Sequence, residues 1–94
     1  MIVRQADRYF LEGPVTLDSV GKLIAESAVF EGSSVVVDLA RVTSADSSAL
    51  SLLLVWVRRF AGSGRKISFA NVNQDLNSLA ELYGVIDLIP VAAD

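Results

Sequence analysis

The apolar and polar positions of the chain follow two different periods, and these periods predict where the strands lie. Residues 2–5 and 8–12 are two short strand-like runs around a polar turn, which predicts a hairpin. Residues 35–39 begin with a continuous β-branched run, typical of a central strand covered on both faces. Residues 65–70 alternate between apolar and polar, which predicts another strand. Residues 15–17 and 85–91 predict short extended segments.

Helical spacing of apolar residues appears in three other segments, residues 18–28, 47–61 and 74–83. Asp18 is expected to cap the first helix, and glycines at positions 62, 64 and 84 are expected to end the other two. A short polar loop, residues 40–45, connects the central strand to the long helix. Strands that alternate with helices predict an α/β fold with parallel pairs and right-handed crossovers.

The long helix, residues 47–61, carries more apolar surface than a small domain needs. We assign to the core the residues that share one arc: Leu50, Leu53, Leu54, Val57 and Ala61. A second stripe lies beside it: Ala49, Leu52, Trp56 and Phe60. This stripe either packs under the third helix or forms part of the surface. We expect partial exposure for Leu52 and Trp56, since tryptophan is enriched at binding hot spots.

The composition of the chain excludes several classes of function. The 94 residues predict one domain, residues 1–94. The net charge is −3 without a large basic cluster, so we do not expect nucleic-acid binding. Cysteine and histidine are absent, which excludes Ser-His triads, Cys-His dyads and the common zinc sites. No apolar run reaches the length of a membrane span, and the first residues lack a signal-peptide layout, so we expect a cytoplasmic protein.

Nothing in the sequence predicts catalysis, a metal or a cofactor. The carboxylates Asp38, Asp46 and Glu81 have no neighbouring base or nucleophile that would form a catalytic group. The glycine-containing stretch at residues 62–66 follows a helix, whereas a phosphate-binding loop precedes one. We therefore expect a non-catalytic protein.

The start of the long helix carries the motif Asp46-Ser47-Ser48-Ala49-Leu50. Aspartate and serine oxygens accept hydrogen bonds from free N–H groups of a first helical turn, so Asp46 or Ser47 can serve as a cap. A serine here also presents a modifiable hydroxyl at the positive end of the helix dipole. From the residues alone, both roles stay open.

A strand that ends in Asp38-Leu39, followed by this motif, resembles the signature of STAS domains over essentially the whole chain. Ala49 departs from the glycine of many members. The resemblance implies a small mixed β-sheet with helices packed mainly on one side, and a helix start that docks on a partner protein. The partner-binding residues expected here are Asp46, Ser47, Ser48, Ala49, Leu52 and Trp56. In regulatory members the hydroxyl after the aspartate is phosphorylated, which corresponds to Ser47.

The resemblance leaves three roles open for the chain, and one of them is a structural or sensory module without a switch. Residues 79–85 and 88–90, and the leucine-rich run at 50–54, resemble the small STAS subunit of the bacterial Mla phospholipid-transport system. That resemblance implies an accessory subunit on the cytoplasmic ATPase of an inner-membrane ABC transporter that maintains outer-membrane lipid asymmetry. Such a subunit reaches the membrane only through its complex. The alternative is an anti-sigma factor antagonist that a serine kinase switches by phosphorylating Ser47.

Overall fold

A computed structural model of the protein describes residues 1–92, and most of its elements lie where the sequence predicts them. The N-terminal part contains β1 (Ile2–Gln5), β2 (Arg8–Leu11), β3 (Gly13–Val15), α1 (Val20–Glu26) and a 3-10 turn, η1 (Ser27–Val29). The remaining elements are β4 (Ser34–Asp38), β5 (Val42–Ala45), α2 (Ser47–Gly62), β6 (Lys66–Ala70), α3 (Gln74–Leu82) and η2 (Ile86–Leu88).

Four strands form a mixed sheet in the order β1-β2-β4-β6. The hairpin β1–β2 is antiparallel, and β4 is parallel to both of its neighbours. Val37 of β4 lies between Tyr9 of β2 and Phe69 of β6, so the β-branched run is an interior strand, as predicted. The expected α/β fold with a small mixed sheet is confirmed.

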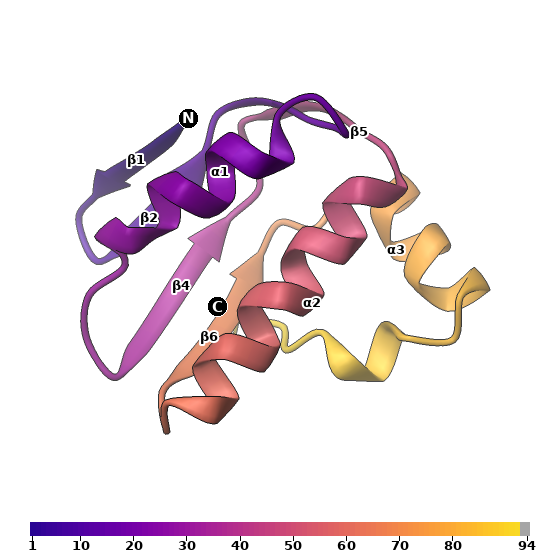
Figure 1. The fold of residues 1–94 in the computed structure, drawn as a ribbon. Coiled ribbons are helices and arrows are strands. Elements are labelled where there is room, and N and C mark those ends of the chain that lie inside the picture. Colours follow the sequence, from indigo (N-terminus) through magenta and orange to yellow (C-terminus); the bar gives the residue numbers. More distant parts are fainter. Residues whose placement is uncertain (93–94) are drawn as a thin grey trace.

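The helices gather on one face of this sheet. In Figure 1, α1 and α2 cross the sheet on the same side, and α3 lies beside α2. The strand residues on this face are buried: Tyr9, Leu11, Val35, Val37, Ile67 and Phe69. Residues between them, such as Val36 and Ser68, point to the opposite face and are only half-buried. The alternation therefore fixes which face of each strand carries the core.

The buried face of α2 is the second stripe together with part of the first. Its buried residues are Ala49, Leu50, Leu52, Leu53, Trp56 and Phe60. The expected partial exposure of Leu52 and Trp56 is wrong, because each retains only 1% of its accessible surface. Trp56 packs edge-on against Phe30, with ring centroids 5.1 Å apart, because the segment after α1 covers that side of α2. Ala61, assigned to the core, is exposed instead.

Three local expectations are also wrong. The loop at residues 40–45 contains β5, which pairs in parallel with β3 and forms a separate two-stranded sheet. Ser19, not Asp18, occupies the N-cap of α1, because the Ser19 hydroxyl bonds the Thr16 backbone and sets the entry turn. The extended segment expected at 85–91 contains η2, and there only Val91 bridges to β6.

The outer edge of β1 is closed by a helix side chain. The Ile2 N–H donates to Glu26 Oε1 at the end of α1, over 2.9 Å. In an antiparallel pair, alternate residues point their N–H groups away from the partner strand. Met1 and Glu12 bond each other, so the intervening N–H of Ile2 faces outward. Glu26 satisfies this donor at the sheet edge.

Candidate protein-binding site at the start of helix α2

Asp46 connects β5 to α2 and caps the helix. Its backbone is extended, with φ −122° and ψ −169°, and its Oδ1 accepts from the Ser48 N–H over 2.8 Å. Its Oδ2 accepts from the Leu17 N–H over 3.2 Å, which holds the loop before α1 against the helix start. Asp46 is therefore the cap, and Ser47 is the first helical residue.

The same hydrogen bonds keep Asp46 ionised. Desolvation raises the pKa of this carboxyl group, but the N–H groups of Ser48 and Leu17 donate to it and outweigh that effect. Its pKa is consequently lower than usual. A charged carboxylate here also interacts favourably with the positive end of the α2 dipole. The helix start thus carries a fixed negative charge beside the exposed hydroxyl of Ser47.

The structure divides the expected partner-binding residues into two groups. Asp46 and Ser47 are exposed, and Ser48 is half-buried. The other three have buried side chains: Ala49, Leu52 and Trp56. Within the part of the chain that the structure describes, the Ser47 hydroxyl has no hydrogen-bond partner. A partner that docks here meets Ser47 but not the side chains of Leu52 or Trp56.

The solvent-facing side of α2 carries other residues that could contact a partner. We call this surface the α2 ridge, and it comprises Ser47, Ser51, Val55 and Arg58. Val55 is half-buried but is not packed against the core cluster. Leu17, next to Asp46, is 74% exposed. The sequence analysis did not predict Val55 or Leu17 as contact residues. Val55 lies outside both apolar stripes of the long helix, and Leu17 lies before α1.

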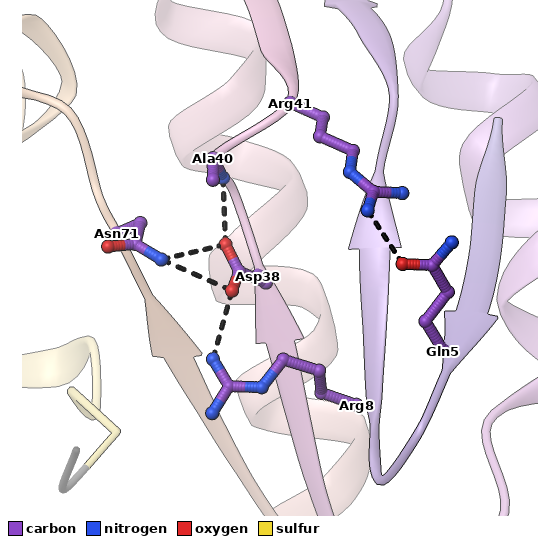
Figure 2. A network of polar contacts seen from close by, with 6 residues as sticks. All are labelled: Gln5, Arg8, Asp38, Ala40, Arg41 and Asn71. Atoms are coloured by element: carbon purple, nitrogen blue, oxygen red, sulfur yellow. Dashed lines mark hydrogen bonds and ion pairs between the residues drawn. The ribbon is translucent and has the colours of Figure 1, made fainter.

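The other motif aspartate, Asp38, has a different environment (Figure 2). It lies at the end of β4 and is only 3% exposed. Arg8 Nη1 donates to its Oδ2 over 2.9 Å, and Asn71 Nδ2 donates to both oxygens over 3.0 and 3.1 Å. The Ala40 N–H donates to Oδ1 over 2.8 Å. Asp38 therefore joins β2, β4 and the residue after β6.

These partners decide the charge of Asp38. Burial alone would raise its pKa, yet the hydrogen bonds from Asn71, Ala40 and Arg8 and the positive charge of Arg8 together lower it. The neighbouring Arg41 is held separately, by Gln5 Oε1 at 2.6 Å and by Glu12 Oε2 at 2.8 Å. This arrangement supports a structural role for Asp38, since its oxygens already accept four hydrogen bonds from three donor groups.

Within residues 1–92, no three acidic residues come together in a way that could hold a metal ion. Over the same residues, no helix combines the length and the apolar character needed to cross a bilayer.

The helix-start motif, the interior strand and the one-sided helices occur together in a known family. A family model described as MlaB, STAS domain, matches residues 3–90. The chain belongs to this STAS family. The predicted resemblance is thus confirmed across nearly the whole STAS domain, while no curated protein sequence matches it.

Solved structures with the same fold include two forms of one protein. The STAS domain matches the unphosphorylated anti-sigma factor antagonist SpoIIAA with a TM-score of 0.71 and 17% identity, covering 100% of this chain and 88% of SpoIIAA. The match to the phosphorylated form of the Bacillus protein SpoIIAA has a TM-score of 0.68 and 17% identity, and it covers 100% of this chain and 91% of that one. The match to a sulfate transporter family protein from Wolinella succinogenes has a TM-score of 0.67 and 18% identity, and it covers 86% of this chain and 68% of that one. These likenesses show the fold.

Proposed function

We propose that this STAS domain is a non-catalytic accessory subunit of an inner-membrane ABC phospholipid transporter that maintains outer-membrane lipid asymmetry. In this role it binds the cytoplasmic ATPase subunit and reaches the membrane only through the complex. The match to an MlaB-type family model supports the choice of this system. No cofactor is needed, because the role is to bind and position another protein.

The exposed α2 ridge is the observation that carries the proposal. Val55 supplies an apolar centre, Leu17 supplies a second exposed apolar side chain, and Ser47 lies at the same end of the molecule as Leu17. Arg58 and Asp46 add charge around these groups. An apolar centre within a polar rim is the usual composition of a protein interface. We propose Asp46, Ser47, Ser48, Leu17 and Val55 as the contact residues.

Co-purification with the ATPase subunit tests this surface. Val55→Asp places a charge at the centre of the interface, where burial without a partner charge is unfavourable, so the complex should be lost. Ala61→Asp is the matched control, because Ala61 is exposed near the other end of the same helix. The control should bind like the wild type. Equal binding by both variants would remove the α2 ridge from the interface.

The second candidate function is an anti-sigma factor antagonist controlled by a serine kinase. SpoIIAA, which shares the fold, has been solved with and without its phosphate. Here Ser47 is exposed at the first position of α2, where a phosphate would gain from the helix dipole but would lie next to Asp46. The exposed, unpartnered hydroxyl is the observation that favours this alternative.

Intact-mass measurement separates the two candidates. The protein is purified from its own cells and is also incubated with the cognate anti-sigma kinase and ATP. The transporter role predicts an unmodified Ser47 in both samples. One added phosphate, lost in Ser47→Ala, would instead support the kinase-controlled antagonist.

A further inference from the structure

A pocket of about 290 Å³ lies between the C-terminal half of α2 and the segment that joins α1 to β4. Its apolar lining includes Ile24, Phe30, Trp56 and Phe60. Two arginines, Arg59 and Arg65, also line it. The pocket is at the end of α2 that lies away from Ser47, so it is distinct from the α2 ridge. A lining of this kind suits a ligand with both an apolar part and a negative charge.

Trp56 gives the first reason to expect a ligand in this pocket. Its indole Nε1–H is buried and has no hydrogen-bond acceptor among the residues that the structure describes. A buried donor without an acceptor is unfavourable, so buried donors nearly always have a partner. Trp56 lines this pocket, so the residue whose donor lacks an acceptor is also next to any molecule bound there.

The two arginines give the second reason. Arg65 is held over the Phe60 ring at 4.3 Å and donates to the carbonyls of Phe30 and Gly32 over 2.9 and 2.7 Å. These acceptors are neutral, so the positive charge of Arg65 stays uncompensated. Arg59 has no carboxylate partner within residues 1–92. The pocket is therefore positively charged.

The two pocket arginines differ from the other arginines that form ion pairs. Arg4, Arg8 and Arg41 each pair with a carboxylate. In the described part of the chain, Arg59 and Arg65 form no ion pair, although both line the pocket. The chain as a whole carries a net charge of −3. Two arginines without carboxylate partners at one pocket of an acidic protein form a local site that attracts anions.

We propose that this pocket binds a small organic oxyanion, either a phosphate ester or a carboxylate with a short apolar body. The anionic oxygens accept hydrogen bonds from Arg59, Arg65 and the Trp56 Nε1–H. The apolar body packs against Phe30, Phe60 and Ile24. A volume of about 290 Å³ lies at the lower end of the range for ligand pockets, which favours a short body over a diacyl lipid. Charge-assisted hydrogen bonds to arginine provide most of the affinity.

Titration with octyl phosphate tests the proposal, because Trp56 is the only tryptophan of the chain. Its fluorescence and its single indole N–H resonance in a ¹⁵N-labelled sample report directly on the pocket. Octyl phosphate, kept below its micelle concentration, should give a saturable change in both signals. Inorganic phosphate and 1-octanol should bind at least about tenfold more weakly, since each lacks one half of the interaction.

Three matched substitutions locate the bound anion. Arg59→Gln should weaken octyl phosphate binding by at least about tenfold, through loss of a charge-assisted bond. Arg58→Gln removes the same charge from the neighbouring exposed residue, and should change binding by about twofold or less because solvent screens it. Lys66→Gln, in the adjoining groove of about 470 Å³ that shares Phe60 and Arg65 with the pocket, should also have little effect because Lys66 does not line the pocket itself. The Arg59 side chain makes no hydrogen bond or ion pair within the described residues, so Arg59→Gln should melt close to the wild type.

The results that would overturn the proposal are equally specific. A linear, unsaturated response or an unmoved indole resonance would show that the pocket does not bind the probe. Equal weakening by Arg58→Gln and Arg59→Gln would assign the effect to general surface charge. Binding of 1-octanol as tight as that of octyl phosphate would make the pocket an apolar cavity, and equally tight inorganic phosphate would remove the organic body from the proposal.

Discussion

The two sides of α2 show how one helix separates stability from recognition. The inner side buries Leu52 and Trp56 almost completely, under the sheet and the segment around Phe30. The outer side, the α2 ridge, exposes Ser47 and leaves Val55 half-buried without core contacts. Both sides carry apolar residues, so an apolar residue alone does not tell which side meets a partner. What distinguishes the two sides is the layer that covers each of them.

Replacing an inner residue should have the largest effect. Leu52→Asp places an unpaired charge in a packed core, so the free energy of unfolding should fall by more than about 4 kcal/mol. The variant should be largely unfolded at 25 °C by circular dichroism. A folded variant with a near-normal urea midpoint would place Leu52 on the surface and reverse the comparison of the two sides.

The same contrast holds between the two motif aspartates, and Asp38 should show the next largest effect. Asp38→Asn removes the charge partner of Arg8 in a buried site, which should lower the free energy of unfolding by about 3 kcal/mol at pH 7. Urea denaturation measures this loss. Asp7→Asn, in the exposed turn between β1 and β2, is the control and should change little.

The pH dependence sharpens the assignment of Asp38. Because its pKa is lower in the folded state, the unfolded chain binds more protons as the pH falls below about 4. The stabilising contribution of Asp38 is therefore complete above that pH and is lost as the pH falls through the folded-state pKa. The difference between wild type and Asp38→Asn should narrow in acid. A constant difference from pH 7 to pH 2 would mean that ionisation of Asp38 is not the cause.

Val55→Asp should destabilise the protein much less than Leu52→Asp, although it is designed to abolish partner binding. Val55 is half-buried outside the core cluster, so about 1 kcal/mol of stability should be lost. Arg58 and Arg59 lie three and four residues later and can pair with the new charge. Thermal melting measures the difference, and a loss as large as that of Leu52→Asp would show that the α2 ridge is part of the core.

Ser47→Ala should have the smallest effect on stability. Asp46 is the cap of α2, and the Ser47 hydroxyl makes no hydrogen bond in the described residues, so the change should stay within about 0.5 kcal/mol. Urea denaturation provides the check. A loss near that of a missing cap, about 1 kcal/mol or more, would move the capping role from Asp46 to Ser47.

The order of strands and helices was predictable because each segment has its own period. The interior position of β4 followed from the β-branched run at residues 35–37, which needs cover on both faces. The sheet pairing of β5 was not predictable. Thr43 and Ser44 appear polar in sequence, and their strand conformation depends on β3, about thirty residues earlier.

The candidate site was only partly predictable, for a similar reason. A helical repeat shows which residues share an arc, but it does not show what lies above that arc. Trp56 is buried because Phe30, distant in sequence, covers that side of α2. The cap at Asp46 was visible in the motif, whereas its bond to the Leu17 N–H depends on a loop 29 residues away. Long-range contacts thus decided what the local pattern left open.

The carboxylate of Glu26 at the margin of β1 has a consequence for self-association. A free edge strand is a template on which another chain can add a strand, and this is a common first step toward fibres. Because Glu26 Oε1 already occupies the outward N–H of Ile2, an incoming strand must first displace a charged group from a helix end. One acidic side chain on α1 thereby makes it harder for another chain to add a strand at the Ile2 end of β1.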